Sequence, residues 1–127
     1  MREVRDGLLY TKTHEWIRKN DDGTIVIGIT DHAQHEIGEA VFIEVPKEGA
    51  DVGAGDEIGA IESVKTVVPM YSPVSGKVMS SNASLEDSPD TVNASPYDDG
   101  WITVIKLSDP GELGGMMDAD AYRSCLK

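Results

Sequence analysis

The chain has 127 residues and is strongly acidic, with 23 Asp and Glu side chains against 11 Lys and Arg and a formal net charge of −12 at pH 7. This balance argues against nucleic acid as a partner, since phosphate binding needs clustered cations, and it disfavours an anionic membrane surface for the same reason. It fits a protein that docks on basic partner surfaces, and it is equally typical of plain solubility. The length predicts one domain over residues 1–127.

Cysteine content and hydropathy bear on where in the cell the chain is expected to lie. The single cysteine, Cys125, has no partner for an internal disulfide. No apolar run approaches the roughly 18 residues of a membrane span, and residues 1–6 lack the apolar core of a signal peptide. We therefore expect a chain that does not enter a membrane and that lies in the cytoplasm.

The first quarter of the chain predicts a β-hairpin. Residues 8–18 carry the bulky side chains of a strand, and residues 24–29 form a β-branched run. Between them, the Asn-Asp-Asp-Gly sequence at 20–23 predicts a turn, because Asp-Gly favours the positive φ angles of a tight hairpin.

A short helix is expected over residues 31–37, ending at Gly38. His32 and His35 are three residues apart and share a helical face. These two histidines could be metal ligands or part of a solvated polar face. We prefer the second interpretation and expect no metal, because no cysteine or third histidine follows at ligand spacing and His14 is distant in sequence.

The middle of the chain predicts three strands and a loop. Residues 40–45 alternate as a half-buried strand does. The glycine-rich stretch 47–56 lacks the Gly-Lys-Ser/Thr ending of a phosphate-binding loop and is expected to be irregular. Residues 57–61 and 67–71 are strand-like, so that residues 62–66 form the tip of a central hairpin.

Strands and short helices are expected in the last third. Strands are predicted at 77–80 and 101–107, with a polar segment that contains one helical turn over 82–93 between them. Asp109-Pro110 can start a helix, and residues 118–126 have the apolar spacing of a C-terminal helix.

The tip of the central hairpin, Glu62-Ser63-Val64-Lys65-Thr66, is the candidate functional site. A lysine between paired strands projects clear of its scaffold, and a second turn signal follows at Pro73–Gly76. A solvated turn lysine is the plain interpretation. We favour a functional lysine, because no other lysine lies between Lys47 and Lys77.

These segments together resemble the H-protein family of the glycine cleavage system over nearly the whole chain. The matching residues are Tyr10, His14-Glu15-Trp16, Gly28–Gln34, Val41-Phe42, Glu62–Lys65, Tyr71–Gly76, Asp87–Pro89, Val92-Asn93, Ser95–Tyr97, Gly100-Trp101 and Ala121-Tyr122. The resemblance implies a mainly β fold, a barrel-sandwich hybrid of the lipoyl-domain type, with an N-terminal hairpin, short helices and a C-terminal helix.

The resemblance also implies lipoic acid in covalent amide linkage to Lys65. The chain would then be a non-catalytic carrier of the aminomethyl intermediate of glycine. Its implied partners are glycine decarboxylase (the P protein), the aminomethyltransferase (the T protein), dihydrolipoyl dehydrogenase (the L protein) and a lipoate-attaching enzyme. The chemistry would belong to the dithiolane and not to the polypeptide.

Two glutamates are further candidate site residues. Glu62 lies three residues before Lys65 and is a candidate recognition contact for the lipoate-attaching enzyme, or else a charged residue on a hairpin flank. In the family the loaded arm folds back into a cleft beside the His-Glu-Trp segment, so the resemblance implies that Glu15 is an amine partner of that arm. Its alternative role is a charge at a strand edge.

One departure from the family pattern bears on function. Members of the family commonly carry Ser-Asp shortly after the lysine, whereas this chain has Val68-Pro69. The missing carboxylate would help to hold a cationic methylamine. An H-like lipoyl carrier that serves lipoate delivery or sulfur oxidation is therefore the second functional hypothesis.

Other classes of protein fit the sequence less well. Biotin carriers set their lysine between methionines, which Val64 and Thr66 do not match. Ser63 and the histidines could form a nucleophile and base, but no nucleophile-elbow glycine pattern surrounds the serine. A structural interaction module with Lys65 unmodified is the remaining alternative.

Overall fold

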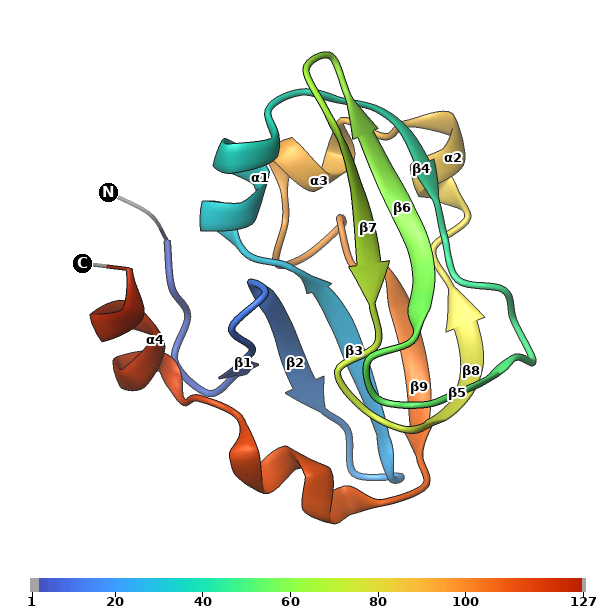
Figure 1. The fold of residues 1–127 in the computed structure, drawn as a ribbon, viewed down its shortest axis with the longest axis vertical. Coiled ribbons are helices and arrows are strands. Elements are labelled where there is room, and N and C mark those ends of the chain that lie inside the picture. The colour runs from blue at the N-terminus through green and yellow to red at the C-terminus, as the bar shows by residue number, and fades with distance from the viewer. Residues whose placement is uncertain (1–2, 127) are drawn as a thin grey trace.

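The computed structural model describes residues 3–126 and shows two antiparallel sheets with short helices at their ends (Figure 1). The six-stranded sheet has the order β1-β2-β3-β9-β8-β5, and the three-stranded sheet has the order β4-β6-β7. The strands are β1 Leu9–Tyr10, β2 Glu15–Lys19, β3 Thr24–Ile29, β4 Ala40–Glu44, β5 Asp51–Val52, β6 Glu57–Ser63, β7 Val67–Tyr71, β8 Gly76–Ser81 and β9 Thr103–Leu107. The predicted mainly β, barrel-sandwich architecture is confirmed.

The N-terminal segment differs from the single strand expected over residues 8–18. The chain turns back on itself at residues 11–14, so that β1 pairs with β2 and Leu9 lies opposite Ile17. His14 has φ 67°, and the Thr11 N–H donates to the Glu15 carbonyl at 3.0 Å. The bulky residues on both sides of this turn are each typical of a strand, so the composition of the segment does not reveal the turn.

The hairpin predicted between the strands at 8–18 and 24–29 is confirmed for the part of the first strand that forms β2, Glu15–Lys19. β2 pairs with β3 from Glu15 opposite Ile29 to Lys19 opposite Ile25. Trp16, which is fully buried, packs across Gly28 of the neighbouring strand. A Cβ at that glycine would lie 2.5 Å from the indole ring, so no larger residue fits opposite Trp16.

The helices are short and are placed by local capping. They are α1 Asp31–Ile37, α2 Ser84–Asp87, α3 Thr91–Ala94, the 3-10 helix η1 Pro110–Gly115 and α4 Ala119–Cys125. The Thr30 hydroxyl accepts a hydrogen bond from the Ala33 N–H and caps α1, which ends at Gly38 with φ 83°. Asp118 caps α4 in the same way.

Two expectations for the connecting segments needed correction. The stretch 47–56 is not wholly a loop, because Asp51–Val52 forms β5 and pairs with Lys77 and Gly76 of β8. The polar segment 82–93 contains two helical turns, α2 and α3, where one was expected. Leu85 of α2 and Val92 of α3 are buried beneath the three-stranded sheet, so that tertiary packing stabilises both turns.

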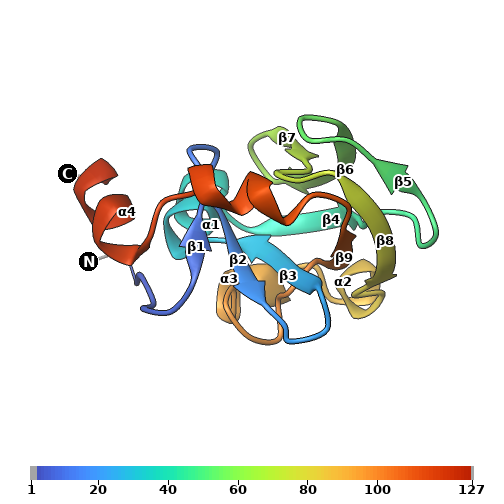
Figure 2. The same cartoon turned by 90° about the horizontal axis from the view of Figure 1, so that it is seen from below.

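The core that supports the central hairpin lies between the three-stranded sheet, α1 and the two turns α2 and α3. Its largest members include Ile43 of β4, Ile61 of β6 and Met70 of β7, all of them buried. Figure 2 shows β6 and β7 on one side of the molecule and α2 and α3 on the other. Within residues 3–126, no helix is long and apolar enough to cross a membrane.

Candidate functional site: a lysine at a hairpin tip beside an apolar cleft

Lys65 lies at the tip of the β6–β7 hairpin, as expected. Glu62 and Val67 form the last paired positions of the two strands, and the three residues between Ser63 and Val67 are all exposed. Figure 1 shows this tip extending past the neighbouring elements at one end of the molecule. The predicted exposure of Lys65 at a turn is therefore confirmed.

Ser63 holds the tip in shape. Ser63 is only 6% exposed. Its hydroxyl oxygen accepts hydrogen bonds from the N–H groups of Lys65 at 3.2 Å and Thr66 at 3.1 Å. The Ser63 backbone N–H donates to the Thr66 carbonyl at 2.8 Å. A serine side chain that binds the following amides stabilises a turn without glycine. Ser63 thus orders the backbone that carries Lys65, where sequence reasoning had weighed it as a nucleophile.

The connection from α1 to β4 supports the tip from the side. The Val64 N–H donates to the Glu39 carbonyl at 3.2 Å. The Lys65 side chain passes over Gly38, where an added Cβ would lie 3.1 Å from the lysine Cε and would also face a φ of 83°. Sequence reasoning used Gly38 only as a helix end, because nothing local shows that a distant lysine lies across it.

An apolar cleft of about 530 Å³ runs from the hairpin tip between β7 and α1. Its walls are largely hydrocarbon, and its polar residues come from the β1–β2 turn, from α1 and from the hairpin tip. The lining residues are Thr13, His14, Glu15, Ile29, His32, Ala33, Glu36, Ile37, Ile61, Thr66, Val68, Pro69, Met70 and Tyr71. Such a cleft can hold a slender apolar chain with a polar end.

Glu15 lies at the polar end of this cleft. Its Oε1 accepts hydrogen bonds from the hydroxyls of Thr11 and Thr13, both at 2.7 Å. Burial raises the pKa of the Glu15 carboxyl above its usual range, although the two hydroxyls act in the opposite direction. Within residues 3–126 the structure gives Oε2 no hydrogen-bond partner, so this oxygen can accept one from a bound group.

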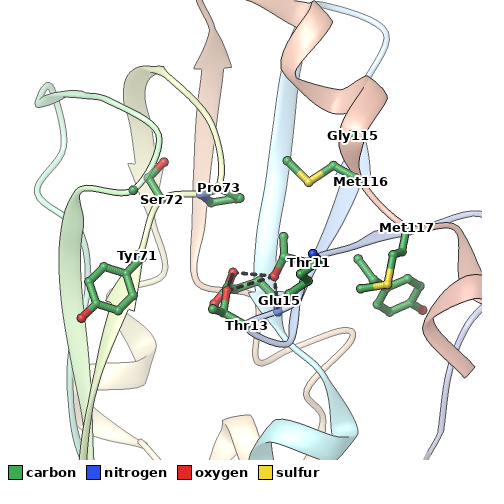
Figure 3. Close-up of a pocket in the computed structure, with 12 residues that line it drawn as sticks. Thr11, Thr13, Glu15, Tyr71, Ser72, Pro73, Gly115, Met116 and Met117 are labelled. Carbon is green, nitrogen blue, oxygen red and sulfur yellow. Dashed lines mark hydrogen bonds between the residues drawn. The ribbon is translucent and has the colours of Figure 1, made fainter. Parts of the chain in front are cut away.

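Glu15 also faces a second hollow of about 470 Å³ on the other side of the β1–β2 turn. Figure 3 shows the Glu15, Thr11 and Thr13 side chains joined by hydrogen bonds, with Pro73 and Met116 on either side. The carboxylate therefore lies at the start of β2, where two hollows meet.

His14 and His32 come together beside the cleft, which the sequence did not predict. Their ring centroids are 4.5 Å apart, and His14 Nδ1 shares a hydrogen bond of 2.8 Å with the Tyr122 hydroxyl. Burial, with a smaller contribution from His32, lowers the pKa of His14 below its usual value. His35 lies apart, with its Nε2 3.5 Å from an Asp31 carboxylate oxygen.

The structure offers no metal centre in the part of the chain that it describes. No three His, Cys, Asp or Glu side chains in residues 3–126 converge in a way that could hold a metal ion. Cys125 is an exposed residue in the last turn of α4.

The three candidate residues from the sequence fall into two places. Glu62 and Lys65 lie at the hairpin tip, where Glu62 is exposed between Phe42 and Val67 on the neighbouring strands. Glu15 lies at the far end of the cleft, beside Tyr71 at the other end of β7. The strand β7 and the cleft beside it connect the two places.

Comparisons with known proteins agree with this arrangement. Residues 8–127 match the family model described as the glycine cleavage H-protein. The chain is 52% identical over 122 residues to the glycine cleavage system H protein of Teredinibacter turnerae, a match that covers 96% of this chain and 94% of the relative. It is 50% identical over 122 residues to the protein of the same name from Chromohalobacter salexigens, with 96% and 93% covered.

The fold has a close counterpart among solved structures. A crystal structure of a glycine cleavage system H protein from Mycobacterium marinum superimposes with a TM-score of 0.88 at 31% sequence identity. The superposition covers 97% of this chain and 98% of that one.

Proposed function

The chain belongs to the glycine cleavage H-protein family of lipoyl carriers, and from this premise we propose that Lys65 carries lipoic acid in amide linkage. The proposed role is to shuttle the aminomethyl intermediate of glycine between glycine decarboxylase, the aminomethyltransferase and dihydrolipoyl dehydrogenase. The observation that supports it best is an exposed lysine on a turn ordered by Ser63, beside an apolar cleft that ends at Glu15.

The residues of the cleft fit a lipoyl arm. A lysine with a lipoyl group is a chain of about ten bonds with a reach of roughly 12–14 Å. Four residues of strand, from Lys65 to Pro69, span about 13 Å. The apolar side chains of Ile37, Val68 and Met70 can cover the hydrocarbon part, and Glu15 lines the same cleft.

Once bound, the lipoyl group would supply the redox and group-carrying chemistry. The chain would contribute positioning. Glu15 Oε2 can accept a hydrogen bond from an ammonium group, and this charge-assisted bond would offset the loss of water around the cation. His14 has a lowered pKa and stays neutral near pH 7, so it adds no positive charge that would repel an amine.

The proposed partners follow from this role. A carrier with a net charge of −12 is suited to basic docking surfaces on its partner enzymes. Glu62, exposed three residues before Lys65, is proposed as a contact for the lipoate-attaching enzyme. A single domain over residues 1–127 and a location in the cytoplasm stay predictions.

A second candidate function is supported by the wall of the cleft. Val68 and Pro69 line the cleft where members of the family commonly carry Ser-Asp, so this wall offers no carboxylate to an amine. Such a wall also suits an H-like lipoyl carrier that serves lipoate delivery or sulfur oxidation, with no amine to bind.

The attachment site can be tested by replacing the lysine. We expect Lys65→Arg to fold normally and to gain no lipoyl mass when incubated with lipoate and a lipoate-attaching enzyme, because arginine keeps the charge but not the reactive amine. Lys47→Arg, a change at another exposed lysine, is the control and should be modified like the wild type. Intact mass spectrometry gives the result, and a lipoyl adduct on the Lys65→Arg variant would refute the assignment.

A loading assay separates the two candidate functions. The lipoylated protein is incubated with glycine decarboxylase and glycine, and the mass of the product is measured. Gain of the aminomethyl group supports the role in glycine cleavage. Lipoylation without any loading would favour the second function.

A further inference from the structure

The three-stranded sheet has one face in the core and one face in solvent. Ile43, Ile61 and Val68 lie side by side in the paired register, with the first two buried and the third half-buried against the core. The neighbouring row, Phe42–Glu62–Val67, points the other way because side chains alternate along a strand.

This outward row is apolar on both sides of Glu62. Phe42 on β4 is 51% exposed and Val67 on β7 is 62% exposed, so two large apolar side chains face solvent on the two edge strands of the sheet. The next row, Glu44–Ala60–Pro69, continues the surface with two more small or apolar residues. We call Phe42, Ala60, Val67 and Pro69, with Glu44 and Glu62, the outer face.

The outer face carries only negative charge. Glu44 and Glu62 are both exposed, and none of the strands β4, β6 and β7 contains a lysine or an arginine. The cationic residue nearest to the outer face in the sequence is Lys65, two residues before Val67. A complementary partner surface would set apolar side chains against Phe42 and Val67 and a basic group against Glu62 between them.

The position of the outer face selects among the partners. An enzyme that acylates Lys65 must bring its active site to the root of the arm, so it has to cover residues within a few ångströms of the hairpin tip. Enzymes that act on the dithiolane meet the far end of the arm, roughly 12–14 Å away, and can leave the root uncovered. Phe42 and Val67 belong to the last paired row before the tip, which is the surface that the first kind of enzyme covers.

We propose that the outer face, centred on Phe42 and Val67, is the docking surface for the lipoate-attaching enzyme. This inference rests on the proposed function, since it needs Lys65 to be the acylated residue. It adds a surface whose central residues, Phe42 and Val67, do not line the cleft, while Pro69 at its margin lies on both.

The test uses the double variant Phe42→Thr with Val67→Thr, which removes apolar surface and places a β-branched residue of high strand propensity at both positions. The matched control is Met79→Thr on β8 of the other sheet, since Met79 is 50% exposed and lies on a different strand. Each protein is titrated with a purified lipoate–protein ligase, lipoate and ATP, and the rate of lipoyl addition is followed by intact mass. Thermal unfolding confirms that each variant is folded.

We expect kcat/KM for lipoylation to fall about tenfold or more in the double variant, mainly through KM, because central apolar contacts dominate interface energies. The control should stay within about twofold of the wild type. After exhaustive lipoylation, loading by glycine decarboxylase should be unchanged in the double variant.

The negative charge of the outer face is tested separately. Glu44→Gln should weaken the dependence of the lipoylation rate on ionic strength, with exposed Glu86→Gln as its control.

The outcomes distinguish this inference from the proposed function. If the wild type is lipoylated and the folded double variant reacts at the same rate, the docking surface is wrong and the carrier role stands. If loading by the decarboxylase falls as much as lipoylation does, the outer face is not specific to the attaching enzyme and the inference is overturned. If the wild type is never lipoylated, the proposed function itself fails.

Discussion

At the scale of single residues, Glu15 combines a structural cost with a proposed role. Its carboxylate is largely removed from water, and two threonine hydroxyls only partly replace that water, so the pKa of the group is raised. A group with a raised carboxyl pKa binds its proton more tightly in the folded state than in the unfolded state. Ionised Glu15 therefore destabilises the fold, which is common where a site is kept for function.

Replacing Glu15 by glutamine tests both sides of this balance. Relative to Glu15→Gln, the wild type should lose stability as the pH rises from about 4.5 through the raised pKa, because the folded state must give up a proton that the unfolded state has already lost. Thermal unfolding across that range measures the effect. Glu86→Gln, at an exposed position, is the control and should show no such trend. A parallel dependence in wild type and Glu15→Gln would contradict the raised pKa.

At the scale of secondary-structure elements, β7 is the edge strand of its sheet and forms one wall of the cleft. Pro69 is compatible with this position, since an edge strand can lack one donor without breaking a ladder. Val68 faces the buried row with Ile43 and Ile61, whereas Pro69 is exposed opposite Ala60. Val68 and Pro69, which stand where the family commonly has Ser-Asp, thus lie on different faces of the same strand.

Restoring the family pattern with Val68→Ser and Pro69→Asp should slow the spontaneous release of ammonia and formaldehyde from the loaded protein. A carboxylate near the amine adds a charge-assisted hydrogen bond of about 1.5–3 kcal/mol if the pair is well desolvated, which corresponds to roughly tenfold or more in rate. The rate is measured without the transferase. The single variant Pro69→Asp separates the carboxylate from the loss of the Val68 side chain. Equal rates in all three proteins would mean that Glu15 or another group already pairs with the amine.

At the scale of the whole molecule, the C-terminal helix α4 holds the polar end of the cleft in place. The Tyr122 hydroxyl shares hydrogen bonds with Thr30 Oγ1 at 2.7 Å and with His14 Nδ1 at 2.8 Å. Its ring stacks on Tyr10 at a centroid distance of 4.5 Å and an interplanar angle of 4°. Burial raises the pKa of Tyr122 to about 12, so the hydroxyl keeps its proton at neutral pH.

Tyr122→Phe should therefore affect both stability and the site. Loss of the hydroxyl removes one hydrogen bond from buried Thr30 and one from half-buried His14, and should cost about 1–3 kcal/mol of unfolding free energy. It should also speed release from the loaded protein, because His14 and the turn that carries Glu15 lose their anchor. Differential scanning calorimetry and the release assay measure the two effects.

Tyr97→Phe is the matched control for Tyr122→Phe. It removes another hydroxyl from a buried tyrosine, one that donates to the Glu3 carbonyl at 2.6 Å. We expect this variant to be destabilised without any change in release. Equal effects of both variants on release would show that α4 acts on the site only through global stability.

The sequence by itself determined the features that depend on a few adjacent residues. The tip with Lys65 follows from two strand-like runs around a five-residue segment, and its geometry is held by hydrogen bonds within Ser63–Thr66. The helix 31–37 follows from the Thr30 cap and Gly38. Such interactions act over one turn of chain, so the local sequence is enough to predict them.

Only the tertiary structure decided the features that join distant segments. The turn between β1 and β2, the meeting of His14 with Tyr122 across 108 positions, and the two walls of the cleft depend on how helices and sheets pack. The same holds for the outer face, where alternation shows which residues share a side but not which side is buried. Long-range contacts form only when packing of the whole core offsets the entropy lost in closing the intervening loops. A local sequence pattern therefore does not predict which distant segments meet.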